Sequence, residues 1–166
     1  MNGLPYLLDA NVFITAKNFY YAFDLAPGFW DSLATNAANG NILSIDYVKR
    51  ELEAHQDNLK DWIINNFVIA FNSTNDNAVI QSYTNVINWV QNQNQFTDAA
   101  KADFARGADG WLVAYAMAKG GIVVTLEILN LNIRRKVPIP NVCQQFGVQF
   151  VDTFEMLRQL GVQLIS

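Results

Sequence analysis

The sequence predicts an α/β protein, a three-layer α/β/α sandwich built on a mainly parallel central sheet. Short apolar runs alternate with longer stretches whose apolar side chains recur at helical spacing, and this alternation continues over the whole chain. The short runs are apolar at nearly every position, which is typical of parallel strands that are buried on both faces. Strands alternating with helices in this way indicate a parallel sheet covered by helices on both sides.

The N-terminal part of the chain predicts a strand, a helix and a second strand. Residues 6–8 form an apolar run that leads into a turn at Asp9. Apolar side chains between 29 and 37 recur at helical spacing, and Gly40 follows as a stop signal. The apolar run 42–45 completes one strand, helix, strand unit.

The rest of the chain continues the pattern without a domain break. The middle part contains, in order, a helix with Asp46 as N-cap, a short helical stretch at 62–67, a long amphipathic helix over 79–90 and a helix from Thr97 to Arg106. The last part contains a helix over 109–119, a strand over 122–125, a short helix begun by Pro140, a strand over 148–151 and a helix capped by Asp152 or Thr153.

Length and composition favour a single domain over residues 1–166. A chain of 166 residues with 51% hydrophobic content is long enough for one core. No apolar run is long enough to cross a bilayer and no signal peptide is recognisable, so we expect a cytoplasmic protein with no membrane partner. The single cysteine, Cys143, can form no internal disulfide, and with the single histidine, His55, it provides too few ligands for a Cys/His zinc site.

The formal net charge of −4 has the wrong sign for a protein that holds nucleic acid by Lys and Arg alone. This objection weakens if several acids converge on one site and bind divalent cations, because the metal ions reverse the local field where a phosphate would lie. The positions of Asp and Glu therefore decide which functions are open to the chain.

Four acidic residues are expected near one edge of the sheet. Ligands of open parallel sheets bind at the carboxyl ends of the strands, and Asp9 and Glu127 follow two strand runs there. Asp109 begins a helix, and Glu51 borders the apolar stripe of another helix. Taken singly, Asp9 and Asp109 are also typical of turns or helix caps, and Glu51 of a solvated surface.

Four converging carboxylates would repel one another without a cation. Their oxygens are hard ligands that select Mg²⁺ or Mn²⁺, and such ions can hold a phosphodiester and lower the pKa of a water molecule. The combination of the four acids therefore predicts at least one Mg²⁺ or Mn²⁺ ion at this edge of the sheet.

Four sequence segments resemble the acidic motifs of PIN-like domains. They are YLLDANVFI at 6–14, IDYVKREL at 45–52, ADGWLVAYA at 108–116 and VVTLE at 123–127. Two segments near the end of the chain, VPIPNVCQQFGV at 137–148 and DTFEMLRQL at 152–160, are similar to a PIN-like branch close to the ribonuclease toxins of bacterial toxin–antitoxin pairs. The resemblance spans nearly the whole chain and implies a metal-dependent endoribonuclease.

The resemblance also implies roles for individual residues. Asp9, Glu51 and Asp109 match the metal-binding acids, and Asn11 matches the small polar residue that supports the first of them. Thr125 and Glu127 match a Thr-x-acid motif in which many PIN-like proteins carry Asp, so Glu127 is expected as an auxiliary catalytic acid. The implied partners are an RNA substrate, a protein antitoxin and a second copy of the chain as a homodimer.

Basic residues near the expected site are candidates for binding RNA. Arg134, Arg135 and Lys136 form the only dense basic cluster, close enough to the Glu127 motif to reach a phosphate backbone at that edge. Lys17 follows the Asp9 turn beside several aromatic residues on which bases could stack. A solvated surface run explains the cluster equally well.

Two other functions compete with the ribonuclease. A PIN-like module that binds RNA or protein without cleaving it would keep the sheet and some of the acids. A phosphatase would use Asp9 as a covalent nucleophile, but such enzymes need a second Asp two residues later, and Asn11 stands at that position.

Overall fold

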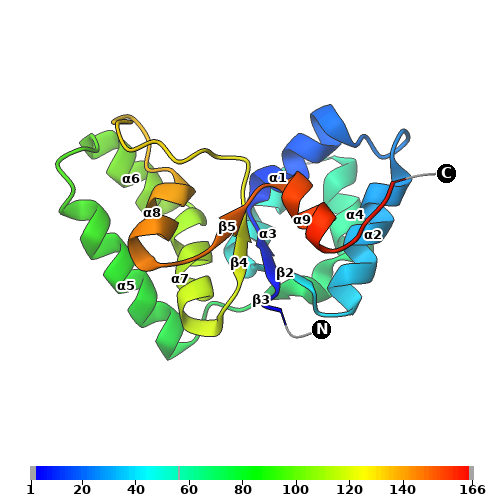
Figure 1. Cartoon of the computed structure of the whole chain (residues 1–166), viewed down its shortest axis with the longest axis horizontal. Coiled ribbons are helices and arrows are strands. Elements are labelled where there is room, and N and C mark those ends of the chain that lie inside the picture. The colour runs from blue at the N-terminus through cyan, green and yellow to red at the C-terminus, as the bar shows by residue number, and fades with distance from the viewer. Residues whose placement is uncertain (1–2, 56, 165–166) are drawn as a thin grey trace.

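The computed structural model describes residues 3–55 and 57–164, and it confirms the predicted α/β/α sandwich (Figure 1). A five-stranded sheet has the order β3-β2-β1-β4-β5, and every pair of neighbouring strands is parallel. The strands are β1 (Tyr6–Leu8), β2 (Ile42–Ile45), β3 (Phe71–Asn72), β4 (Ile122–Val124) and β5 (Phe150–Val151). The helices are α1 (Ala10–Thr15), η1 (Ala16–Tyr20), α2 (Pro27–Ala38), α3 (Asp46–Glu53), α4 (Asn58–Asn66), η2 (Val68–Ala70), α5 (Asn77–Gln91), α6 (Asp98–Arg106), α7 (Asp109–Lys119), α8 (Ile139–Phe146) and α9 (Thr153–Gln159).

The strand order places β1 at the centre of the sheet, and the connections on its two sides lead in opposite directions across the sheet. Leu7 pairs with Leu43 of β2 on one side and with Val123 of β4 on the other. The connection from β1 leads towards β2, whereas β4 continues to β5 on the opposite side. The carboxyl ends of β1 and β4 therefore form a topological switch point, which is where open parallel sheets bind their ligands.

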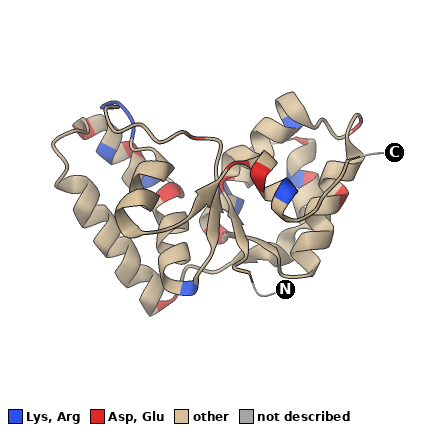
Figure 2. Ribbon diagram, viewed as in Figure 1, with Lys and Arg blue, Asp and Glu red and all other residues tan. Residues whose placement is uncertain are grey.

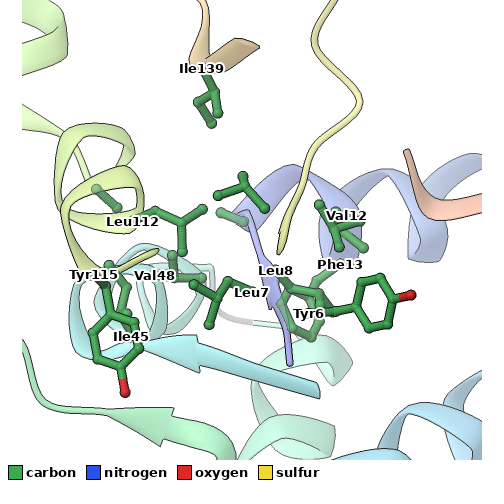
Figure 3. Close-up of a cluster of buried hydrophobic side chains, with 14 of the residues drawn as sticks. Tyr6, Leu7, Leu8, Val12, Phe13, Ile45, Val48, Leu112, Tyr115 and Ile139 are labelled. Carbon is green, nitrogen blue, oxygen red and sulfur yellow. The ribbon is translucent and has the colours of Figure 1, made fainter. Parts of the chain in front are cut away.

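Helices cover both faces of the sheet. Figure 1 shows α5 to α8 on one side and α1, α2, α4 and α9 on the other. In the core of Figure 3, Leu112 and Tyr115 come from α7, while Val12 and Phe13 come from α1. Leu7 and Leu8 of β1 are fully buried, as expected for a central strand between two helical layers.

Most elements agree with the prediction, and the differences lie at the ends of elements and in the short strand β3. The expected turn after Asp9 is the start of α1, because Ala10 and Phe13, three residues apart, are both buried on one face of a helix. Asp46 is the first residue of α3 instead of its N-cap, and its carboxylate accepts hydrogen bonds from the amide and hydroxyl of Thr74. Strand β3 was not predicted, since two residues are too few to form a recognisable pattern.

No helix within the described parts of the chain is long and apolar enough to span a membrane.

Candidate functional site

Asp9 and Thr125 stand side by side where β1 and β4 end. The amide of Asp9 donates to the carbonyl oxygen of Val124 at 3.1 Å, and the amide of Thr125 donates to that of Val151 at 3.0 Å. These bonds extend the parallel pairing by one residue beyond each strand. Both side chains are almost completely buried, with exposed fractions of 3% for Asp9 and 2% for Thr125.

The carboxylate of Asp9 does not cap a helix. Asp9 occupies the N-cap position of α1 but makes no side-chain capping bond, and its Oδ2 accepts a hydrogen bond from the hydroxyl of Thr125 at 3.2 Å. Burial raises the pKa of Asp9 well above its usual range, and the negative charges of Asp109, Glu127 and Glu51 raise it further. The capping interpretation of Asp9 is therefore wrong, because its carboxylate is buried among other acids and bonds to Thr125.

Asp109 is likewise not a capping residue. It is the first residue of α7, the N-cap is Ala108, and no side-chain bond caps this end. Burial and the nearby charge of Glu127 raise its pKa to about 7, although Lys136 opposes the shift. The helix dipole favours a negative charge at this end, but the combined effect of burial and the other acids is larger.

Glu51 approaches the start of α7 from α3. Its Oε1 accepts a hydrogen bond from the amide of Ala108 at 3.0 Å. A Cβ atom at Gly107 would lie 3.5 Å from the same oxygen, which is an ordinary van der Waals distance, so the carboxylate packs beside Gly107. Glu51 is exposed, but its carboxylate is anchored at Ala108, the residue before Asp109.

Glu127 is held by the segment that leads into α8. Its Oε1 accepts a hydrogen bond from the amide of Ile139 at 2.8 Å, and its Oε2 lies 3.3 Å from Nζ of Lys136. The amide of Glu127 in turn donates to the hydroxyl oxygen of Thr125 at 3.1 Å. Glu127 therefore borders the other three acids while both of its oxygens already have partners.

The four predicted acids line one pocket, which we call the acidic pocket. Its volume is about 470 Å³. The lining residues are Asp9, Ala10, Asn11, Ile14, Glu51, Ala54, His55, Asp103, Gly107, Asp109, Glu127 and Lys136. The predicted supporting residue Asn11 is among them, and Thr125 contacts Asp9 directly.

The structure brings only part of the predicted basic set to the acidic pocket. Lys136 lines it, and Arg135 lines an adjoining pocket of about 210 Å³ that shares Asp109 and Lys136 with it. Arg134 is exposed in the same loop, which is the blue stretch before α8 in Figure 2, and lines neither pocket. Lys17 does not line the acidic pocket either and forms an ion pair with Asp57.

Two residues that the sequence indicates as surface residues, His55 and Asp103, also line the acidic pocket. Both are exposed, and Asp103 forms an ion pair with Arg106 on its own helix. Neither stands after a strand, so the strand-end criterion could not find them. The spacing of Asp103 six residues before Asp109 was the one available signal.

The donor set of the acidic pocket fits a hard divalent cation. The four predicted carboxylates that line it come from α3, from α7 and from the segments after β1 and β4, and Asp9 is buried with a hydroxyl as its hydrogen-bond partner. In residues 3–55 and 57–164, no three Asp, Glu, His or Cys side chains lie close enough together to hold an ion in this structure. The fit is therefore one of chemistry and charge.

Comparison with known proteins gives one family. A family model described as "Domain of unknown function (DUF4411)" matches residues 6–164, a range that includes all four acids. No curated protein matches the chain in sequence.

Proposed function

The chain belongs to the DUF4411 family, and from the acidic pocket we propose that it is a metal-dependent endoribonuclease of the PIN-like kind. One observation carries the proposal. The carboxylate of Asp9 is buried and does not cap the helix, and Asp109, Glu51 and Glu127 lie close enough to raise its pKa. Keeping four acids together destabilises the fold unless a cation offsets their repulsion. Such a cluster at a switch point of the sheet is better explained by a function than by stability.

Asp9, Glu51 and Asp109 would hold Mg²⁺ or Mn²⁺. Each has at least one carboxylate oxygen without a hydrogen-bond partner among the described residues, because the bonds found use Oδ2 of Asp9 and Oε1 of Glu51. A bound ion would supply positive charge next to the phosphodiester and lower the pKa of the attacking water. Thr125 fixes the orientation of Asp9, as residues behind a metal ligand usually do.

The chain's own cations would hold the RNA backbone. Lys136 lies at the acidic pocket, and Arg135 lines the adjoining pocket, so both can contact phosphates next to the cleaved bond. A groove of about 790 Å³, which shares Glu127 with the acidic pocket, is lined by Tyr20 and Phe154 among others. Tyr20 is 58% exposed, and its ring offers a surface on which an unpaired base can stack.

Cleavage of RNA by the purified protein tests the proposal. Single-stranded RNA and DNA of the same sequence are incubated with the wild type and with Asp9→Asn, in Mg²⁺, in Mn²⁺ or in EDTA. We expect the wild type to cut RNA only with a metal ion, and the variant to lose at least about 100-fold in rate because a ligand is missing. RNA cleavage that persists in EDTA would contradict the metal mechanism.

The biological role that we propose is that of a toxin in a bacterial toxin–antitoxin pair, with a small protein that covers the acidic pocket. Induced expression of the wild type in bacterial cells should then arrest growth, and Asp9→Asn at the same protein level should not. Equal growth with both proteins would contradict the toxin role and leave the nuclease activity to the cleavage assay.

The proposed homodimer is checked by the mass of the purified protein in solution.

A module that binds RNA without cutting it is the second candidate. It is favoured by the partners that already occupy both oxygens of Glu127. RNA binding without any cleavage in Mg²⁺ or Mn²⁺ would support this candidate against the nuclease.

A further inference from the structure

The carboxylate of Glu127 is fully engaged with the loop that follows it. One oxygen accepts the amide hydrogen of Ile139, which is the first residue of α8, and the other lies beside the ammonium group of Lys136. Because Pro138 and Pro140 have no N–H group, Ile139 provides the only amide donor among these three residues. The N-terminal end of α8 carries a partial positive charge, which stabilises the negative charge of Glu127 beside it.

The loop over 126–138 is fixed at several further points. The side chain of Asn141 in α8 accepts from the amide of Asn130 at 3.0 Å and donates to its carbonyl oxygen at 2.8 Å. Gln95 donates to the carbonyl oxygen of Ile133 at 2.7 Å, and the amide of Thr97 donates to that of Arg134 at 2.9 Å. These bonds hold the loop against α8 and against the segment before α6.

Lys136 is the cation that this arrangement places at the acidic pocket. Of the Lys and Arg residues that the structure describes, it alone lines that pocket. Its Nζ is 3.3 Å from Oε2 of Glu127, and half of its side chain is exposed. An ammonium group in this place can reach a phosphate bound over Asp9 and Asp109.

We propose that Glu127 is a positioning residue and not a metal ligand: it holds Lys136 at the acidic pocket, so that one divalent ion and the Lys136 ammonium together face the phosphodiester. This inference rests on the proposed function and gives the fourth acid a different role from the one expected of the motif. An ion bound to Oε2 of Glu127 would displace the ammonium group of Lys136, and an ion bound to Oε1 would leave the buried amide of Ile139 without an acceptor. Asp9, Glu51 and Asp109 each keep an oxygen that has no hydrogen-bond partner within the described parts of the chain, so an ion bound there breaks no such contact.

The first test is titration calorimetry with Mn²⁺ on the full-length protein, which gives the number of ions bound per chain and the affinity of each variant. We expect one ion per wild-type chain. Glu127→Gln keeps an oxygen for Ile139 and should change the affinity less than about tenfold, whereas Asp109→Asn should lower it by more than about 100-fold. An equal loss in the two variants, two ions per wild-type chain, or no Mn²⁺ binding at all would overturn the proposal.

The second test follows the amide of Ile139 by hydrogen exchange with and without saturating Mg²⁺. If Glu127 stays with the loop, the exchange of this amide is slow in both conditions, and Glu127→Ala speeds it. Faster exchange when Mg²⁺ is added to the wild type would show that Glu127 leaves the loop to bind the ion, which overturns the proposal.

The third test is a double-mutant cycle with Lys136→Met and Glu127→Gln, using the binding of a single-stranded RNA oligonucleotide in EDTA. If Glu127 acts through Lys136, the double variant binds no more weakly than Lys136→Met alone; additive losses would contradict this. A wild type that neither binds nor cuts RNA refutes the proposed function, while the metal and exchange measurements still decide the role of Glu127.

Discussion

The hydroxyl group of Thr125 connects two acids of the pocket: it donates to Oδ2 of Asp9 at 3.2 Å and accepts from the amide of Glu127 at 3.1 Å. Both Thr125 and Asp9 are buried, so water cannot easily replace either bond. The orientation of Asp9 and the start of the loop after β4 therefore depend on one oxygen atom.

Replacement of this hydroxyl should weaken metal binding. Thr125→Val has nearly the same shape but loses both bonds, and we expect it to lower the affinity for Mn²⁺ by about 10-fold to 100-fold. Thr125→Ser retains the hydroxyl and serves as the matched control, with an affinity close to that of the wild type. Titration calorimetry measures both, and equal affinities for Val and Ser would show that the hydroxyl does not orient Asp9.

The metal-free protein should lose stability as the pH rises from about 4 to about 7. Burial raises the pKa of Asp109 from 3.8 to about 7 and that of Asp9 above its usual range. Between the unfolded and folded pKa values the folded state binds more protons, so unfolding releases protons and a higher pH favours it. This contribution is fully present below the unfolded pKa and is lost as the pH rises through the folded pKa.

Urea unfolding in EDTA at pH 5.0 and pH 7.5 measures this loss of stability. The neutral variant Asp109→Asn should show a smaller loss and, at pH 7.5, should be more stable than the wild type. Asp31→Asn, which removes an exposed acid in α2, is the control for net charge and should behave as the wild type. A wild type whose stability rises over this range would contradict the raised pKa values.

Divalent ions should reverse the loss of stability that the metal-free protein shows at pH 7.5. A ligand at 100 times its dissociation constant stabilises a protein by about 2.7 kcal/mol. For a chain of this size that corresponds to a rise of about 5–10 °C in Tm. Thermal unfolding at pH 7.5 should show this rise with Mn²⁺ for the wild type and none for Asp9→Asn; the same rise in both would place the ion elsewhere.

Gly110 should be intolerant of a side chain. A Cβ atom there would lie 3.0 Å from Cε2 of Phe104 and 3.1 Å from Cε1 of Tyr83, so α7 would have to move away from these rings. We expect Gly110→Ala to cost about 1–3 kcal/mol of unfolding free energy and to displace the neighbouring Asp109. Gly28→Ala, where the nearest atom is 3.8 Å away, is the control and should be close to neutral in the same urea experiment.

The fold class could be predicted because its signals are local. The apolar run of β1 and the helical spacing between 29 and 37 depend on a few neighbouring residues, and both elements were found where they were expected. Strand β3 has two residues and gave no signal. Asp46 bonds to Thr74, 28 residues later, and no local pattern reports such a contact.

The composition of the acidic pocket could be predicted better than the contacts within it. Asp9, Asp109 and Glu127 were found from their places at strand and helix ends, and they do line one pocket. The pairing of Glu127 with Lys136 and Ile139 depends on the path of the intervening loop, which has no periodicity to interpret. Lys17 illustrates the same limit, since its partner Asp57 is 40 residues away.

The rate of RNA cleavage by matched acid variants tests the central claim most directly. Wild type, Asp9→Asn, Asp109→Asn and Asp31→Asn are compared on one single-stranded RNA in Mn²⁺, after each variant is shown to be folded. The proposed site predicts that the first two substitutions lower the rate at least about 100-fold and that Asp31→Asn leaves it unchanged. Cleavage at the wild-type rate by Asp9→Asn and Asp109→Asn would show that the acidic pocket is not the site of the reaction.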